Sequence, residues 1–182
     1  PIQWPCSSER APGATRLFKD GRFAHRSGRA RVHAIPFSRS AELSAQFPFV
    51  LTTGRVRDQW HTRTRTGKVG KLSQADWTPF VEIHPNDAGR LGIEHGAPVT
   101  IRSSAGSACA EARVTDGIKE GAVFLPMHVG RRLAGGTGCA NNATESRVDP
   151  VSKEPDFKFV PVAVEAEDPA AVEDVQRRLD VL

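Results

Sequence analysis

Six short runs rich in β-branched and aromatic residues recur along the sequence, and this repetition most constrains the fold. One of them, residues 97–102, alternates apolar and polar side chains, which is typical of a strand with one buried face. The six expected strands cover residues 49–53, 80–84, 97–102, 109–115, 123–126 and 159–164. So many short strands, separated by two long loops, predict an all-β fold built as a small closed β-barrel.

Two helices are expected beside these strands. A short internal helix opens at His84 and ends near Gly92, where glycine suits the left-handed cap of a helix. The tail over 168–182 predicts a C-terminal helix, with Asp168 as its cap and Pro169 in its first turn. Four apolar residues of this tail fall on one helical face: Val172, Val175, Leu179 and Leu182.

The expected organisation is an irregular arm over 1–45, a barrel domain over 46–166 and the C-terminal helix over 167–182. A chain of 182 residues suits one domain with extensions. The arm is basic and poor in core residues, so it packs on something larger or serves as a linker. Because the chain begins with Pro1 rather than Met, we expect it to be a fragment of a longer protein.

Charge is distributed unevenly along the chain. Residues 1–75 hold 14 Lys and Arg against 4 Asp and Glu, whereas residues 76–182 hold 11 against 17. This split indicates an anionic partner for the first part. Nucleic acid, an anionic cofactor and an acidic protein surface all remain open at this point.

The cysteines and the apolar runs indicate a cytoplasmic protein. Cys6, Cys109 and Cys139 are odd in number, and their spacings fit no zinc or iron–sulfur pattern. Reduced thiols are therefore expected. No apolar run approaches the roughly 20 residues of a membrane span, and no secretory leader is recognisable at the start.

A polar loop over residues 54–78 follows the first strand, and loops of this length are usually functional or disordered. Thr53 and Gly54 end the strand, and the glycine lets a ligand approach the backbone closely. Arg55 and Arg57 offer forked donors suited to phosphate. The loop therefore predicts an anion-binding segment, and the alternative is a solvated basic loop.

Further along this loop, Trp60 offers a face for a flat ring and His61 a hydrogen bond. Hydroxyls then alternate with cations, in the order Thr62, Arg63, Thr64, Arg65, Thr66 and Lys68. In an extended conformation this stretch would place the hydroxyls on one face and the cations on the other.

Several residues late in the chain are further candidates for binding. Asn141 lies in a glycine-rich loop; its amide suits a heterocycle edge, although asparagine is also common in turns. Lys158 follows Phe157 and suits a phosphate or pterin oxygen, or else is an ordinary strand-edge lysine. His128 follows a strand end, where a lone histidine is more often structural than catalytic.

The sequence shows no catalytic apparatus and no metal site. No serine or cysteine nucleophile is recognisably paired with a base. Walker, dinucleotide-fingerprint and HExxH motifs are missing as well. The residues by themselves therefore predict a binding module.

An ordered series of motifs resembles the C-terminal molybdopterin-guanine-dinucleotide-binding domain of the molybdopterin oxidoreductases. Within that family these motifs are most similar to those of bacterial nitrate reductases, especially the assimilatory type. The matching segments in the domain are residues 53–55, 60–62, 64–66, 81–92, 121–128, 140–144 and 149–158, and those in the arm are 2–6, 16–23 and 28–31. The sequence departs from the family pattern at Arg63, at Ala143 and over 129–132, where an aromatic residue is expected after His128.

This resemblance implies a double-psi β-barrel with bis-molybdopterin guanine dinucleotide as its ligand. It further implies that the remainder of the catalytic subunit, with a [4Fe-4S] cluster and the molybdenum ligand, lies upstream. The implied enzyme reduces nitrate to nitrite, and this chain alone is expected to be inactive. The predicted cofactor-binding residues are Thr53, Gly54, Arg55, Trp60, His61, Thr62, Thr64, Thr66, His128, Asn141, Phe157 and Lys158.

Two other kinds of binding module are compatible with the residue patterns. A free-standing barrel of the same shape would bind a peptide or a protein. A nucleic-acid binder would use the basic first half, although the aromatic and zinc signatures of such proteins are missing. The cofactor-binding interpretation requires the segments 53–68 and 141–158 to meet at one end of the barrel.

Overall fold

The computed structural model describes residues 4–34, 36, 41–72, 78–130 and 136–167. The chain separates into two compact units, Pro1–Ser38 and Arg39–Leu182, and each is described by itself. The described residues of the first unit form turns and bends, without helix or strand. Within it the rings of Phe18 and Phe23 stack with their centroids 4.7 Å apart.

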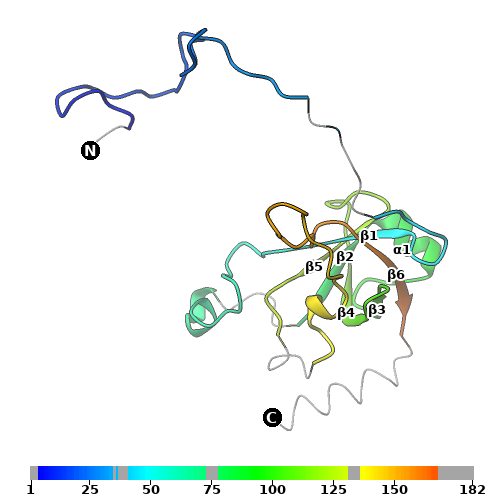
Figure 1. The fold of residues 1–182 in the computed structure, drawn as a ribbon. Coiled ribbons are helices and arrows are strands. Elements are labelled where there is room, and N and C mark those ends of the chain that lie inside the picture. Colours follow the sequence, from blue (N-terminus) through cyan, green and yellow to red (C-terminus); the bar gives the residue numbers. More distant parts are fainter. Residues whose placement is uncertain (1–3, 35, 37–40, 73–77, 131–135, 168–182) are drawn as a thin grey trace. The chain divides into compact units, whose positions relative to one another are not determined.

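Six strands of the second unit close into a barrel in the order β1-β5-β2-β4-β3-β6 (Figure 1). β1 pairs in parallel with β5, and β2 with β4, while the other neighbours are antiparallel. Each of these six strands therefore pairs with a neighbour on both sides. The predicted closed β-barrel is thereby confirmed. The strands are β1 (Phe49–Gly54), β2 (Phe80–Ile83), β3 (Pro98–Arg102), β4 (Ser107–Val114), β5 (Ala122–Pro126) and β6 (Val160–Ala166).

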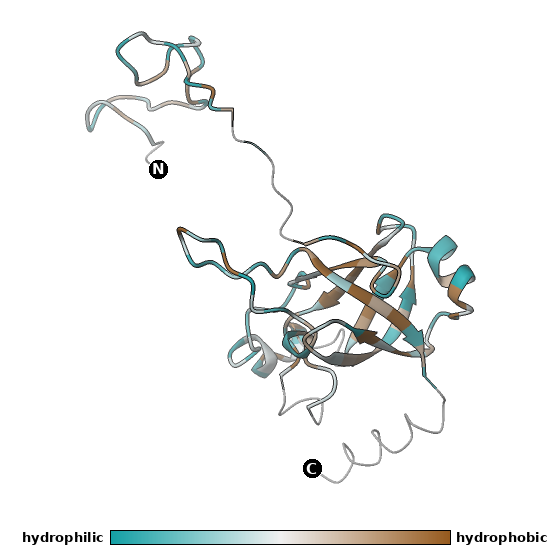
Figure 2. Ribbon diagram, turned by 45° about the vertical axis from the view of Figure 1, so that its right-hand side comes forward, coloured by the Kyte–Doolittle hydropathy of each residue, from teal (hydrophilic) through white to brown (hydrophobic). Residues whose placement is uncertain are grey.

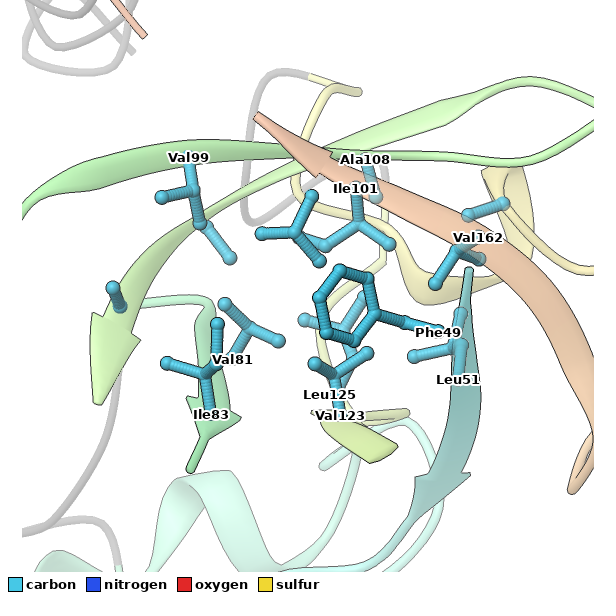
Figure 3. Close-up of a cluster of buried hydrophobic side chains, with 14 of the residues drawn as sticks. Phe49, Leu51, Val81, Ile83, Val99, Ile101, Ala108, Val123, Leu125 and Val162 are labelled. Atoms are coloured by element: carbon cyan, nitrogen blue, oxygen red, sulfur yellow. The ribbon is translucent and has the colours of Figure 1, made fainter. Parts of the chain in front are cut away.

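The interior of the barrel is filled by the apolar side chains that alternate along the strands. In β1, for example, Phe49 and Leu51 are buried, whereas Val50 and Thr52 are only partly covered. Figure 3 shows these inward side chains meeting from all sides of the barrel. Each fully buried aliphatic side chain contributes about 1.5–3 kcal/mol of transfer free energy. Figure 2 shows hydrophobic colour concentrated on the strands and hydrophilic colour on most connecting loops.

One short α-helix, α1 (Pro85–Leu91), follows β2, as the sequence predicted. The ring of His84 caps its first turn by accepting a hydrogen bond from the backbone N–H of Asn86 at 3.2 Å. Gly92 ends the helix in the left-handed conformation, with φ of +65°. A glycine has no Cβ to penalise this conformation, which explains its place after the last turn.

Asp87 connects α1 to the start of β5. Its side chain is completely buried and accepts a hydrogen bond from the backbone N–H of Gly121 at 2.7 Å. Arg90 pairs with the same carboxylate. A buried charge with both a cation and a donor avoids the desolvation cost of an unpaired one.

The described parts of the connections contain three short 3-10 helices: η1 (Thr66–Lys68), η2 (Gly70–Leu72) and η3 (Ala140–Asn142). β4 begins at Ser107, two residues before the strand expected over 109–115. The predicted C-terminal helix over 168–182 lies outside the described residues. No helix in the described part of the chain has the length and apolar character needed to cross a membrane.

Candidate functional site

Hydrogen bonds join the end of β1 to the segment that precedes β6. The backbone N–H of Thr53 donates to the carbonyl oxygen of Phe157 at 3.2 Å, and its hydroxyl donates to the same oxygen at 3.1 Å. The ammonium group of Lys158 donates in return to the carbonyl of Thr53. Thr53 is buried, whereas Lys158 is exposed. The structure therefore brings the start of one predicted segment and the end of the other together.

Gly54, the last residue of β1, sits where the surrounding packing leaves no room for a side chain. A Cβ built there would lie 2.8 Å from Cε2 of Phe124 and 3.8 Å from Nζ of Lys158. The carbonyl of Gly54 accepts a hydrogen bond from the N–H of Met127 at 2.8 Å. The sequence reasoning assigned this glycine to ligand approach and did not single out Phe124. The structure shows that packing of the barrel itself already requires a glycine.

Arg55, Trp60 and His61 form a cluster of side chains at the surface. The guanidinium carbon of Arg55 lies 4.4 Å from the centroid of the Trp60 ring. The ring of His61 meets Trp60 edge-on, with centroids 4.6 Å apart and planes at 87°. Trp60 is 54% exposed. An exposed cation–π contact contributes only about 0.5–1 kcal/mol, so an anionic ligand competes easily for Arg55.

Gln59 and Thr66 close the loop that carries this cluster. The side-chain amide of Gln59 donates to the carbonyl of Leu72, and its oxygen accepts the hydroxyl proton of Thr66 at 2.9 Å. The N–H of Trp60 donates to the hydroxyl oxygen of Thr66 at 3.1 Å. Gln59 is 5% exposed. Sequence reasoning missed it because a glutamine in a polar loop gives no signal of burial.

The extended arrangement considered for residues 62–68 is wrong. His61 and Arg63 adopt left-handed backbone conformations, with φ of +44° and +65°, and the chain enters η1 at Thr66. The hydroxyls of Thr62 and Thr64 bond to each other at 2.8 Å, and Arg63 is buried rather than facing solvent. An alternation of Thr and Arg has no apolar face to hold it against a sheet, so turns replace the extended form.

His128 fixes the loop through both ring nitrogens. Its Nε2 accepts a hydrogen bond from the N–H of Val56 at 3.0 Å. Its Nδ1 lies 2.5 Å from the carbonyl oxygen of His61 and therefore carries the donated proton. The ring is 3% exposed. These contacts give His128 a structural role, and its contact with a cofactor stays a prediction.

Asn141 lies on η3, between two alanines that anchor this segment in the core. Ala140 and Ala143 are buried, whereas Asn141 is exposed. The carbonyl of Asn141 accepts a hydrogen bond from the hydroxyl of Thr144 at 3.1 Å. The neighbouring Asn142 directs its side-chain amide to the carbonyl of Gly136 at 2.6 Å. The element is thus held in place while the Asn141 side chain stays accessible.

Asp149 organises the loop before Phe157. Its carboxylate accepts hydrogen bonds from the N–H of Val151 at 3.0 Å, and from the N–H and hydroxyl of Ser152 at 2.6 and 2.9 Å. These bonds favour the ionised form and lower the pKa of Asp149. Val148 and Pro155 form a bridge across the loop. The segment is therefore ordered by its own hydrogen bonds.

Exposed cations dominate the loop between β1 and η2. Asp58 is the single acid among residues 54–72 and pairs with Arg57 at 3.1 Å. Its hydrogen bond and charge raise the pKa of Arg57. The remaining exposed cations of this loop are Arg55, Arg65, Lys68 and Lys71. A surface with charges of one sign attracts ligands of the opposite sign.

Comparison with known families shows that these segments all fall within one family domain. Residues 49–161 match a family model described as "Molydopterin dinucleotide binding domain". The matched range runs from the first residue of β1 into β6, and so contains all the segments of the site.

Curated relatives fall into two groups. The chain is 36% identical over 165 residues to an F420-dependent formate dehydrogenase subunit alpha of Methanocaldococcus jannaschii, covering 90% of this chain and 24% of that protein. It is 38% identical over 165 residues to a nitrate reductase of Klebsiella oxytoca, covering 90% and 18%. The chain thus spans about a fifth of the length of these relatives.

A solved structure shares the fold at low sequence identity. The acetylene hydratase of Pelobacter acetylenicus superposes with a TM-score of 0.57 and 17% identity, covering 66% of this chain and 18% of that one. The family model matches well over half of the present chain, including all six strands in whole or in part. The protein therefore belongs to the molybdopterin dinucleotide-binding domain family.

Proposed function

We propose that this chain is the cofactor-binding domain of a molybdenum oxidoreductase catalytic subunit. It holds part of bis-molybdopterin guanine dinucleotide at the end of the barrel where β1 stops. The observation that carries the proposal is the junction of Thr53 with Phe157 and Lys158. It brings the ends of two polar segments to one place, inside the range that matches the family.

The side chains present fit such a cofactor. Arg55 is an exposed forked donor for phosphate oxygens, and the exposed ring of Trp60 suits a flat heterocycle. Asn141 offers an amide for a guanine or pterin edge, and Lys158 offers an ammonium group at the junction. When bound, the cofactor supplies redox chemistry at molybdenum, while these residues bind and orient it.

Completion of the site by the rest of a catalytic subunit is part of the proposal. The chain corresponds to about a fifth of its relatives' length, which leaves room for the molybdenum ligand and a [4Fe-4S] cluster elsewhere. A cytoplasmic location is also proposed, supported by three free cysteines. The double-psi topology is proposed as well, supported by the two parallel pairs, β1 with β5 and β2 with β4.

Nitrate is the proposed substrate of the complete enzyme. Similarity to the Klebsiella oxytoca nitrate reductase supports it. Formate is a second candidate, which the Methanocaldococcus jannaschii relative favours with nearly the same identity. The two substrates demand opposite directions of electron flow, so a dye assay separates them.

The proposal is tested on the purified full-length catalytic subunit. Molybdenum is measured by mass spectrometry and the pterin by fluorescence after oxidation. Near-stoichiometric amounts of both are expected, whereas a folded subunit that contains neither would refute the proposal. Oxidation of a reduced viologen by nitrate, against reduction of an oxidised dye by formate, then identifies the substrate. The isolated chain is expected to bind the cofactor weakly in calorimetry, because half of the site lies elsewhere.

A further inference from the structure

We infer that the β3–β4 turn, residues 103–106, positions Asn141 for its contact with the cofactor. The inference rests on the proposed function, because it gives the turn a role in holding that ligand. Its structural basis is a set of contacts between the hairpin of β3 and β4 and the segment 136–145. Gly106 lies against the backbone of this segment at Asn142.

Gly106 meets the backbone of η3 with no space for a side chain. A Cβ at this position would lie 2.6 Å from the carbonyl oxygen of Asn142, a separation that real Cβ atoms do not show. Its φ is +155°, a value that residues with side chains seldom adopt. The two backbones therefore touch directly, next to Asn141 in the sequence.

The turn itself is held in one conformation by Ser103. The N–H of Ser103 donates to the carbonyl of Gly106 at 2.8 Å, and its hydroxyl reaches the same oxygen at 3.3 Å. The N–H of Ala105 donates to that hydroxyl oxygen at 3.0 Å. Ser103 is only 6% exposed. Because these hydrogen bonds hold the turn in one conformation, the turn fixes the position of the segment that packs against it.

Two further contacts from the same hairpin hold the segment on both sides of Asn141. The N–H of Cys109 in β4 donates to the carbonyl of Thr137 at 3.0 Å. The hydroxyl of Ser104 donates to the carboxylate of Glu145. Asn141 lies midway between Thr137 and Glu145 in the sequence, so the hairpin supports the segment before, beside and after it.

These contacts make Gly106 a positioning residue rather than a binding residue. A hydrogen bond between an amide and a heterocycle edge depends on the placement of both partners to a fraction of an ångström. A side chain at position 106 would displace Asn142, and with it Asn141, without removing any group that touches the ligand. Its effect on cofactor retention should therefore pass through Asn141.

A double-mutant cycle in the full-length holoenzyme tests this coupling. The measured quantity is the rate at which molybdenum and pterin leave the protein after dilution. Asn141→Ala is expected to raise this rate about tenfold, as for one lost hydrogen bond in a desolvated site. Gly106→Ala should raise it about fivefold in the wild-type background but less than about twofold in the Asn141→Ala background.

Two more variants keep the test decisive. Gly117→Ala is the matched control, because a Cβ there meets only the hydroxyl of Thr115, at 3.3 Å. It should leave the release rate unchanged in both backgrounds. If Gly106→Ala fails to fold, Ser104→Ala is used in its place. Ser104 is exposed, so this variant removes only the hydrogen bond to Glu145 and should disturb the fold less. Its smaller effect should vanish in the Asn141→Ala background as well.

The outcomes separate the inference from the proposed function. A wild-type subunit without molybdenum and pterin would refute the proposed function itself. A loaded wild type in which Gly106→Ala and Asn141→Ala act multiplicatively, or in which Asn141→Ala has no effect, would overturn the inference alone. A loaded enzyme in which the effect of Gly106→Ala shrinks in the Asn141→Ala background supports both.

Discussion

The ammonium group of Lys158 donates a hydrogen bond to the backbone carbonyl of Thr53, which lies 105 residues earlier in the chain. The last registered pair between β1 and β6 is Leu51 opposite Val160. The contact of Lys158 with Thr53 lies beyond this pair and continues the connection between the two strands to the end of the barrel. A carbonyl at a strand end needs a partner when it is partly buried. Lys158 supplies that partner and keeps a cation at the junction of the two segments.

Replacement of Gly54 by alanine should destabilise the barrel. The added methyl group would approach Cε2 of Phe124 to 2.8 Å, so the ring has to move within a packed wall. Overpacking of this kind costs about 1–3 kcal/mol. A thermal unfolding scan of the chain should therefore show a melting temperature lowered by several degrees.

Gly89→Ala is the control for Gly54→Ala, and it should stabilise the barrel rather than destabilise it. Gly89 lies inside α1, and a Cβ there meets nothing within 4 Å. Alanine at an exposed helix position is favoured over glycine by about 0.5–1 kcal/mol. If Gly54→Ala leaves the melting temperature unchanged while Gly89→Ala raises it, the contact with Phe124 does not exclude a side chain at position 54.

Arg55→Ala in the full-length enzyme should lower cofactor retention, because a forked phosphate donor is lost. Loss of a charged hydrogen bond at a ligand costs about 1.5–3 kcal/mol, or roughly 10- to 100-fold in affinity. Molybdenum and pterin content after purification is the measurement. Lysine at this position should recover part of the loss, since it keeps the charge but not the fork.

Arg57→Ala is the matched control for Arg55→Ala. Arg57 is exposed and bonded to Asp58 through Nε at 3.2 Å and Nη2 at 3.1 Å. Its guanidinium is already committed to a carboxylate, so its loss should reduce cofactor content less. Equal losses in the two variants would indicate a general electrostatic attraction instead of a defined phosphate contact.

His128→Ala should loosen the loop between β1 and η1. Without the ring, the N–H of Val56 and the carbonyl of His61 both lose their partners. Loss of a partly buried hydrogen bond costs about 0.5–1.5 kcal/mol. Hydrogen exchange of peptides covering residues 55–64 should accelerate, while peptides from β3 and β4 stay protected. Uniform acceleration across the barrel would instead show that His128 supports the whole fold.

The barrel was predictable because its strands carry local signals. The strand signal over 97–102 and the glycine after α1 act within a few residues, and β3 and the helix end appear there, although Thr100 is buried along with Val99 and Ile101. The order of the strands around the barrel was not derivable from residue patterns. It depends on parallel pairs such as β1 with β5, whose partners lie some 70 residues apart, and no local pattern encodes that choice.

The candidate site was predictable by residue type and less so by conformation. Exposed Arg55 and Trp60 lie where the loop was expected to bind a ligand, but the left-handed turns at His61 and Arg63 replace the extended form. Burial of Gln59 and the packing of Phe124 on Gly54 arise from tertiary contacts. Two of the positions that depart from the family pattern, Arg63 and Ala143, are buried.

Acid should release the loop ordered by Asp149. Hydrogen bonds from Val151 and Ser152 lower the pKa of this carboxyl in the folded protein. The stabilisation is thus present above the ordinary carboxyl pKa of about 4 and is lost as the pH falls through the lower folded value. NMR measurement of the Ser152 amide between pH about 5 and about 2 should show the loss. In Asp149→Asn the same amide should show no such titration, and a titration that persists would assign it to another group.

Cys109 should react more slowly with alkylating reagents than Cys6. Cys6 is exposed, whereas burial is the main cause that raises the pKa of Cys109, so less thiolate is present at neutral pH. A rate at least about tenfold lower is expected, as followed by mass spectrometry of the two peptides. The hydrogen bond with Thr100 opposes the effect of burial. Thr100→Val should therefore slow Cys109 further and leave Cys6 unchanged, and a faster Cys109 in that variant would mean that Thr100 acts by shielding the thiol.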